Sequence, residues 1–392
     1  MTDEGHRHVS WPDACATRLA RHGLAEPVAA HRLAEVVGTI CGAHAQVMSA
    51  AELSIGIRVA GITRADVRQA LWVERSLVKT YGPRGTVHLL AATDLPTWTG
   101  ALSAVAEPSR FPDGIRLTSD QLDRVVAAID EALADRELTT DELGEEVVAR
   151  TGAWAGERVM PAFQDLWPRW RQAIRTAAAR GVLCFGPDRG RNVTYTSPRR
   201  WLPGFEPAPE REALAGILRR YLFAYGPATP QQFGRWLGVS GREVARFFEA
   251  LADEAIPVDL DGTACWAVGA AADGAGADRA RLEPRGVRLL PYFDAYAVGC
   301  HPRESLFPGR AFERALTGGQ AGNVPVVLVD GVIRGVWHQR RSGARLAITV
   351  EPFGGLTAAQ RGAIDDQVAR IGEILEARAS WTLGEVTVGP HA

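Results

Sequence analysis

The sequence feature that most constrains the fold is a block of helix-sized apolar segments followed by two short β-rich segments around a Gly/Pro turn. The β-rich segments, 77–81 and 86–90, flank Gly82-Pro83-Arg84-Gly85, and this pattern predicts a β-hairpin. Apolar spacing, together with Thr63 as an N-cap, predicts helices at 28–40, 50–59 and 63–74. Helices followed by a hairpin in this order predict a winged-helix unit.

The same pattern recurs twice further along the chain. The second copy has predicted helices from Thr118, from Thr139 and over 161–180, and a hairpin at 182–185 and 193–195. The third has helices at 211–225, 229–237 and 240–251, then strands at 256–260 and 264–268.

A Gly/Ala-rich stretch, 269–276, is typical of a linker. Beyond it, short β segments and one long helix, 358–378, predict a domain of a different kind. We therefore expect an α+β fold with three tandem winged-helix units and a C-terminal β-rich, barrel-like domain. The expected boundaries are 1–106, 107–204, 205–270 and 280–392.

Composition excludes several functional classes. The 392 residues carry a net charge of −2, so the global charge does not indicate nucleic-acid binding. The five cysteines are far apart and form no C-x-x-C pair, which argues against a disulfide framework and a zinc site. No apolar run is long enough to span a membrane, and the N-terminus does not resemble a signal peptide. We expect a cytoplasmic protein without metal or cofactor.

The segment Cys41-Gly42-Ala43-His44-Ala45-Gln46 is unusual because it places two uncharged polar side chains between two predicted core helices. In a continuous helix His44 and Gln46 would point about 200° apart, since each residue advances by ~100°. If the helix ends near Gly42 and the chain becomes extended, both fall on one side. The pair is then either incidental or aimed by a deliberate break in the backbone.

Several stretches resemble a known family. They are Arg84-Gly85-Thr86-Val87-His88-Leu89, Leu289-Leu290-Pro291-Tyr292-Phe293-Asp294-Ala295-Tyr296, Val329-Asp330-Gly331 and Val350-Glu351-Pro352-Phe353. In the same order, over nearly the whole chain, they are similar to the winged-helix family that contains the AlkZ/YcaQ-type DNA glycosylases. The resemblance implies three winged helices and a β-barrel-like domain around a DNA channel, and excision of bulky N7-alkylated purines, including interstrand crosslinks.

The family's catalytic signature is Gln, an apolar residue, then Gln or Asp, in the first winged helix. The matching positions here are His44-Ala45-Gln46, so His replaces the first Gln. This departure resembles a His-containing variant in glycosylases that protect producers of trioxacarcin-like alkylating agents. The resemblance therefore implies that His44 and Gln46 are catalytic and that the protein serves antibiotic self-resistance; a diverged, non-catalytic member is the alternative.

The chemistry of these residue types is compatible with such a reaction. An N7-alkylated guanine is cationic and leaves as a neutral base without a general acid. His44 could accept a proton from the attacking water, and Gln46 could orient that water. A lyase step through a Schiff base needs an amine, and Lys79 is the only lysine in the sequence. We therefore expect a monofunctional glycosylase.

Local arginine clusters are the expected DNA contacts, because phosphate neutralisation sets affinity whatever the global charge. The expected DNA-binding residues are Arg84, Arg189, Arg191, Tyr195, Arg199, Arg200, Arg340 and Arg341. Tyr292 and Asp294 are candidates for a lesion pocket, with a turn role as the alternative for Asp294.

Two other functions remain compatible with the sequence. Winged helices commonly serve transcription regulators, which are generally dimers on paired half-sites. A non-catalytic protein could instead bind alkylated DNA or the drug itself. We expect a nucleoid-associated monomer that acts on double-stranded DNA with bulky N7-guanine adducts.

Overall fold

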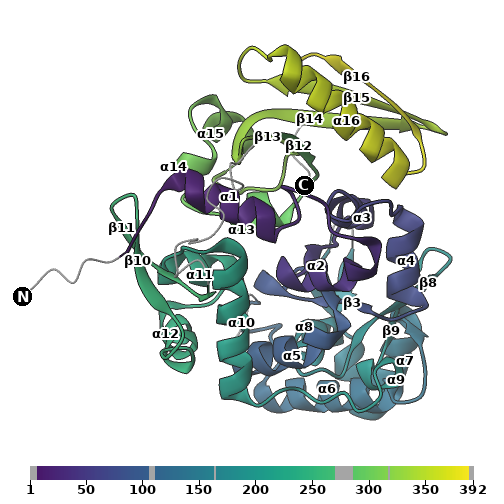
Figure 1. The fold of residues 1–392 in the computed structure, drawn as a ribbon. Coiled ribbons are helices and arrows are strands. Elements are labelled where there is room, and N and C mark those ends of the chain that lie inside the picture. The colour runs from purple at the N-terminus through teal and green to yellow at the C-terminus, as the bar shows by residue number, and fades with distance from the viewer. Residues whose placement is uncertain (1–6, 106–110, 163–164, 270–285, 317, 388–392) are drawn as a thin grey trace, which may run out of the picture.

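The computed structural model describes residues 7–105, 111–162, 165–269, 286–316 and 318–387. The linker expected at 269–276 lies, from residue 270 on, outside the described residues. No helix in these described ranges is long and apolar enough to cross a bilayer. Figure 1 shows the C-terminal sheet at the top, with the helices of the first part of the chain beneath it and α10 running vertically near the centre.

The first part of the chain forms helices around a small three-stranded sheet of order β2-β4-β3. Thr63 caps a helix through a reciprocal box with Asp66, as its position predicted. The elements are β1 (Arg7–Val9), α1 (Trp11–Arg21), η1 (Ala30–Arg32), α2 (Leu33–Thr39), β2 (Ala43–His44), α3 (Met48–Gly56), α4 (Arg64–Trp72), β3 (Leu77–Tyr81), η2 (Pro83–Gly85), β4 (Val87–Ala91), η3 (Ala92–Asp94) and α5 (Leu95–Ala104).

The second part repeats the order helix, strand, helix, helix, hairpin, with a sheet of order β5-β9-β8. It has its own core, separate from the rest, built around Val125, Ile129 and Trp170. The elements are α6 (Ser119–Leu133), β5 (Leu138–Thr139), α7 (Thr140–Thr151), η4 (Ala153–Gly156), β6 (Arg158–Pro161), β7 (Leu166–Pro168), η5 (Arg169–Ala173), α8 (Ile174–Ala179), β8 (Cys184–Arg189), β9 (Asn192–Thr196) and α9 (Pro198–Trp201).

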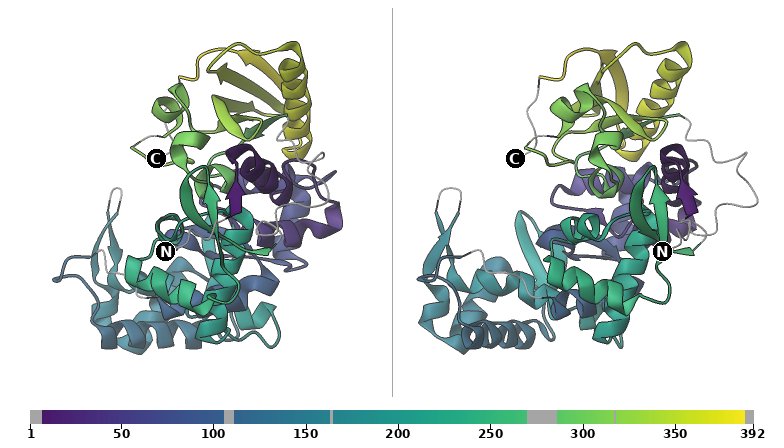
Figure 2. Two further views of the ribbon diagram at one scale, coloured as in Figure 1. Left: turned by 60° about the vertical axis from the view of Figure 1, so that its left-hand side comes forward. Right: turned by 90° about the vertical axis from the view of Figure 1, so that its left-hand side faces the viewer.

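The single helix predicted over 161–180 is wrong. The segment instead contains the second strand of the β6–β7 hairpin, the short η5 turn and α8. Pro168 explains the difference, because proline has no N–H for the helix ladder and restrains Trp167 before it to an extended backbone. In Figure 2 this part of the chain lies at the lower left in both views, away from the C-terminal sheet.

The third part again places helices before a hairpin. Its elements are α10 (Glu210–Tyr225), α11 (Pro230–Leu237), α12 (Gly241–Ala250), β10 (Ile256–Leu260) and β11 (Thr263–Ala267). The N-terminal strand β1 pairs in parallel with β10, an interaction across about 250 residues that local sequence patterns did not predict. Strand β1 is thus fixed to the third part.

The C-terminal part is one five-stranded sheet of order β12-β13-β14-β15-β16, packed against α16. The sheet is curled, and within the described residues its edge strands β12 and β16 are not paired with each other, so these five strands do not close into a barrel. The elements are β12 (Val287–Leu290), α13 (Ala295–Gly299), α14 (Arg303–Leu306), α15 (Arg310–Ala315), β13 (Val326–Val329), β14 (Val332–Ser342), β15 (Arg345–Pro352), α16 (Ala358–Ile374) and β16 (Arg378–Leu383).

One continuous hydrophobic core joins the first, third and C-terminal parts. It includes Leu90 on β4, Tyr221 on α10 and Trp337 on β14. Burial of apolar surface on this scale is the main force that holds these parts together. A site that lies where they meet is therefore held by all three.

Candidate active site

The backbone breaks sharply between α2 and the segment that carries His44. After α2 ends at Thr39, Cys41 adopts φ 60° and Gly42 φ 97°, and the chain then enters β2. A Cβ at Gly42 would lie 2.6 Å from Leu90 Cδ2, so glycine is required both for the left-handed backbone and for close packing. The chain therefore leaves the helix and becomes extended at Gly42, as the sequence suggested for an aimed His44.

His44 lies where strands and loops from distant parts of the sequence converge. Strand β2 pairs antiparallel with β4, which sets His44 directly opposite His88. The His44 ring is stacked on Phe293 with centroids 4.4 Å apart, and it makes an edge contact with His88 at 5.1 Å. Only 9% of the surface of His44 is exposed, and its ring is held by these two contacts.

A small cavity of about 20 Å³ lies beside His44. This volume is enough for one water molecule, provided that polar groups surround it. Its walls combine β2, the η2 turn, α10, α11 and the start of α13; they are formed by Cys41, Gly42, His44, Pro83, Arg84, His88, Tyr225, Trp236, Phe293, Ala295 and Val298.

Gln46 follows two residues later and lies at the surface. It is exposed in the bend between β2 and α3, whereas His44 is buried. The main chain between them is anchored by the Ala45 amide, which donates to the Val87 carbonyl at 2.7 Å. Gln46 is therefore the residue of the pair that faces solvent.

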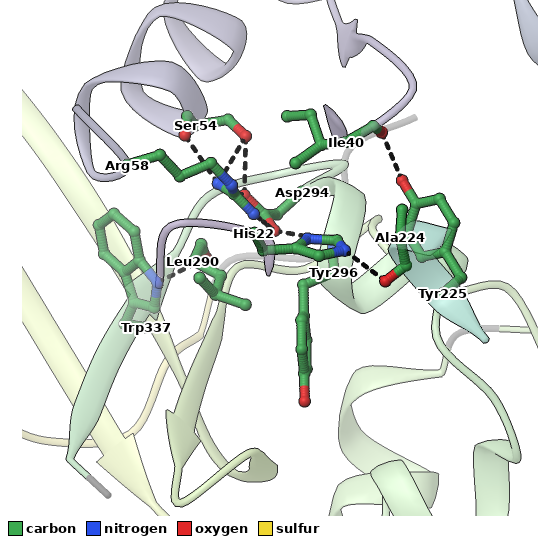
Figure 3. A network of polar contacts seen from close by, with 10 residues as sticks. All are labelled: His22, Ile40, Ser54, Arg58, Ala224, Tyr225, Leu290, Asp294, Tyr296 and Trp337. Carbon is green, nitrogen blue, oxygen red and sulfur yellow. Dashed lines mark hydrogen bonds and ion pairs between the residues drawn. The ribbon is translucent and has the colours of Figure 1, made fainter. Parts of the chain in front are cut away.

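The turn that carries Phe293 is anchored by a buried ion pair. Asp294 and Arg58 are both fully buried and form two hydrogen bonds of 2.8 Å (Figure 3). Asp294 also accepts hydrogen bonds from the Ser54 hydroxyl at 2.8 Å and from the Tyr296 amide at 3.0 Å. Desolvation raises the pKa of Asp294, but the Arg58 charge and these hydrogen bonds outweigh it and hold that pKa below its usual value.

This geometry separates the two residues that were candidates for a lesion pocket. Asp294 is an internal anchor and the N-cap of α13, which is the turn role considered as its alternative. It has no exposed surface with which to touch a lesion. Tyr292, which is half-buried, lies beside Phe293 with ring centroids 6.3 Å apart, so it is at the edge of the His44 site.

Arg84 does not project from the tip of the first hairpin as the sequence suggested. Its backbone has φ 58°, and its guanidinium donates to the Trp236 carbonyl on α11. Its own carbonyl accepts from Arg175 at 2.8 Å. Arg84 therefore joins the first, second and third parts of the chain beside the cavity.

The second hairpin has exposed arginines but a buried tyrosine. Arg189 binds Glu142 at 3.0 Å, Arg199 lies 3.4 Å from Asp130, and Arg191 is exposed near the turn. Arg200 is also exposed and donates to Thr196 Oγ1 at 2.7 Å. Tyr195, by contrast, is 4% exposed and packs in the core of this part, so it is not placed to touch DNA.

Arg340 and Arg341 lie at the exposed end of the long strand β14. Arg341 donates to the Leu375 carbonyl at 2.9 Å after α16, while Arg340 lies opposite Ala347 on β15. Both are at the surface of the C-terminal sheet.

Sequence reasoning did not single out His88 or Phe293, although both lie in the motifs that carried the family resemblance. The signal that would have identified His88 is strand register, because His88 is opposite His44 only in the observed pairing. Within the described residues, no cluster of three His, Cys, Asp or Glu side chains could hold a metal ion.

Comparison with known proteins identifies the family. The family model "DNA glycosylase AlkZ-like" matches residues 37–374. The "Interstrand DNA cross-link repair glycosylase" of Streptomyces sahachiroi is 32% identical over 344 residues, which cover 84% of this chain and 88% of that protein. The solved structure of Streptomyces sahachiroi DNA glycosylase AlkZ is similar, with a TM-score of 0.80 and 27% identity, over 96% of this chain and 100% of that one. The chain thus belongs to the AlkZ-like DNA glycosylase family.

Proposed function

We propose that this DNA glycosylase is monofunctional and hydrolyses the N-glycosidic bond of bulky N7-alkylguanine adducts in double-stranded DNA. We further propose that His44 and Gln46 are its catalytic residues. The observation that carries the proposal is the placement of His44: a forced break at Gly42 aims it at a water-sized cavity, and Phe293 and His88 hold its ring.

The proposed reaction needs little assistance at the leaving group. The N7-alkylated guanine carries a positive charge, so the electron pair of the C1′–N9 bond leaves with a base that becomes neutral. His44 accepts one proton of the water whose oxygen bonds to C1′. Gln46, which is exposed, contacts the sugar or phosphate and orients the water through its amide.

The lysine content supports hydrolysis without a lyase step. Lys79 is the only lysine in the sequence, and its Nζ lies 5.0 Å from the centre of the Phe185 ring in the second part of the chain. A Schiff base with the opened sugar would need an amine beside C1′, next to His44.

We assign the three helix-plus-hairpin parts as winged-helix units that, with the C-terminal sheet, surround one duplex. The exposed guanidinium groups of Arg191, Arg199 and Arg340 are the proposed phosphate contacts. A single chain then supplies the whole DNA-binding surface, so we propose a monomer of 42.2 kDa.

The proposed biological role is self-resistance to a DNA-alkylating natural product of the trioxacarcin type. The presence of His44 in place of the first Gln of the family signature supports a specialised adduct as the substrate. The Streptomyces sahachiroi relative is named for interstrand cross-link repair, which supports including crosslinks of N7-alkylguanine among the substrates to be tested.

The test is a single-turnover assay on a duplex with one site-specific bulky N7-guanine adduct. Released base is measured by mass spectrometry, and abasic sites are measured by strand cleavage in mild base. Wild type should release the modified nucleobase. The rate of release should be lower in both His44→Ala and Gln46→Ala, by about 10²-fold or more in His44→Ala, which removes the proposed general base. His31→Ala and Gln231→Ala, at exposed positions outside the site, are the matched controls and should retain wild-type rates.

The assay also separates the competing functions. Tight binding to adducted duplex without base release, across methyl, bulky and crosslinked adducts, would identify a non-catalytic binder. A dimer that prefers one sequence of undamaged DNA would identify a regulator. Equal rates for wild type and His44→Ala would overturn the assignment of His44.

A further inference from the structure

The histidine that faces His44 has only one ring nitrogen available as an acceptor. His88 Nδ1 lies 2.9 Å from the Thr86 carbonyl oxygen. A carbonyl oxygen can only accept, so Nδ1 carries the proton in this bond. In the neutral ring, Nε2 is then the nitrogen with the lone pair.

The position of the His88 ring is fixed by two glycines. A Cβ at Gly82 would lie 3.0 Å from Nδ1 and 3.1 Å from Cγ of His88, and a Cβ at Gly42 would lie 3.6 Å from its Cδ2. With 5% of its surface exposed, His88 has little freedom to turn. Strand pairing places it directly opposite His44, and both rings line the same water-sized cavity.

Two other polar side chains that line the cavity donate their hydrogens to backbone carbonyl oxygens. The Tyr225 hydroxyl donates to the Ile40 carbonyl at 2.6 Å, and the Arg84 guanidinium donates to the Trp236 carbonyl. His88 Nε2, the unprotonated nitrogen of a ring that lines this cavity, is thus a side-chain acceptor suited to a hydrogen of water.

We propose that His88 is a positioning residue for the reaction: fixed as the Nδ1–H form, it offers Nε2 as the second acceptor for the water that His44 deprotonates. The inference rests on the proposed function. The water donates one hydrogen to each histidine, and its lone pair is left to attack C1′. His44 keeps the proton that it accepts, the water oxygen bonds to C1′, and the C1′–N9 electron pair leaves with the neutral guanine.

A neutral His88 also suits the charge that forms on His44. The groups that face His88 are His44 on β2 and Arg84 on η2, with Phe293 and Trp236 as uncharged walls. Burial, followed by the neighbouring His44, lowers the pKa of His88 well below its usual value, and the hydrogen bond to Thr86 only partly opposes this. A second cation therefore does not form beside the His44 imidazolium.

Two substitutions separate the two nitrogens of His88. His88→Asn keeps a donor for the Thr86 carbonyl but has no group at the place of Nε2, whereas His88→Gln extends an amide toward that place. We expect the single-turnover rate to fall by about tenfold or more in His88→Asn, within the range of acid–base contributions, and to be largely retained in His88→Gln. DNA affinity should stay within about twofold in both variants.

The pH profile distinguishes positioning from a merely structural role. Wild type should gain activity through one acidic limb as His44 loses its proton. In His88→Asn the midpoint of that limb should move to lower pH, because the His44 imidazolium loses a neighbouring acceptor. A lower rate with an unmoved limb would overturn the proposal.

A measurement without substrate keeps this test separate from that of the proposed function. Nitrogen-15 NMR of the free protein should show His88 as the neutral Nδ1–H tautomer from pH 5 to 8, about the range in which an ordinary histidine titrates. The titration midpoint of His44 should be lower in His88→Asn than in wild type. A charged or Nε2–H His88, or an unchanged His44 midpoint, overturns the inference even if base excision is observed. Gly82→Ala, which crowds the ring, is the second perturbation if His88→Asn does not fold.

Discussion

Removing Arg58 should destabilise the protein far more than an average substitution. Arg58 and Asp294 have no exposed surface, and each forms two hydrogen bonds of 2.8 Å with the other (Figure 3). In Arg58→Met the Asp294 carboxylate would keep only the Ser54 hydroxyl and the Tyr296 amide as donors. Breaking a buried pair by removing one partner costs about 3–5 kcal/mol, because the other charge stays buried and uncompensated.

The same argument predicts non-additive effects. Asp294→Asn leaves the Arg58 charge buried without a counter-charge, so it should cost a similar amount in the free energy of unfolding. The double variant Arg58→Met/Asp294→Asn contains neither charge, so its loss should be smaller than the sum of the single losses by about 1–3 kcal/mol.

Acid should reduce the difference between wild type and Arg58→Met. The pKa of Asp294 is lowered in the folded protein, so its contribution to stability is present above the unfolded value and is lost as pH falls through the folded value. The unfolded value for Asp is about 3.9. Because the uncompensated Asp294 carboxylate of Arg58→Met takes up a proton more readily than an unfolded Asp, the difference in unfolding free energy should begin to shrink above about pH 4 and continue to shrink below it.

Urea denaturation of the four proteins at neutral and acidic pH is the assay, with an exposed arginine variant, Arg242→Met, as the matched control. A loss under about 1 kcal/mol for Arg58→Met, or single losses that add in the double variant, would refute the reasoning.

Three further predictions concern the site and its surroundings. Gly42→Ala should lower the free energy of unfolding by about 1–3 kcal/mol and slow base release, because φ is 97° and the new Cβ would lie 2.6 Å from Leu90 Cδ2. Urea denaturation measures the first effect, and the excision assay measures the second. Phe293→Leu should slow base release while leaving DNA affinity unchanged, because the ring stacked on His44 is lost; weaker DNA binding with an unchanged rate would contradict this. Tyr195→Phe should leave DNA affinity unchanged, because Tyr195 is buried. Arg191→Ala should weaken DNA binding and lower the number of counterions released on binding by about one. Fluorescence anisotropy over a salt series measures both quantities.

Local sequence signals predicted the helix starts and strands that depend on residues close together in the sequence. Thr63, Thr118 and Thr139 each begin a helix, as predicted, and each also forms a reciprocal capping box. The strand 256–260 was predicted at its observed bounds. The break at Gly42, which the sequence left as one of two possibilities, is observed.

The features that sequence reasoning missed depend on contacts between distant residues. Strand β1 forms only by pairing with β10, and Asp294 is an internal anchor only because Arg58, 236 residues earlier, folds against it. The surface positions expected for Arg84 and Tyr195 differ from those observed for the same reason: Arg84 donates to the Trp236 carbonyl on α11, and Tyr195 packs in the core of the second part. No periodicity within one segment encodes such a partner.

The most direct measurement of the central claim is release of the modified base from a duplex with one bulky N7-alkylguanine, under single-turnover conditions, by wild type and His44→Ala. The account predicts one free base and one abasic site per duplex for wild type, and a rate lower by about 10²-fold or more for His44→Ala with DNA affinity unchanged. Binding without base release by wild type, or equal rates for the two proteins, would contradict it.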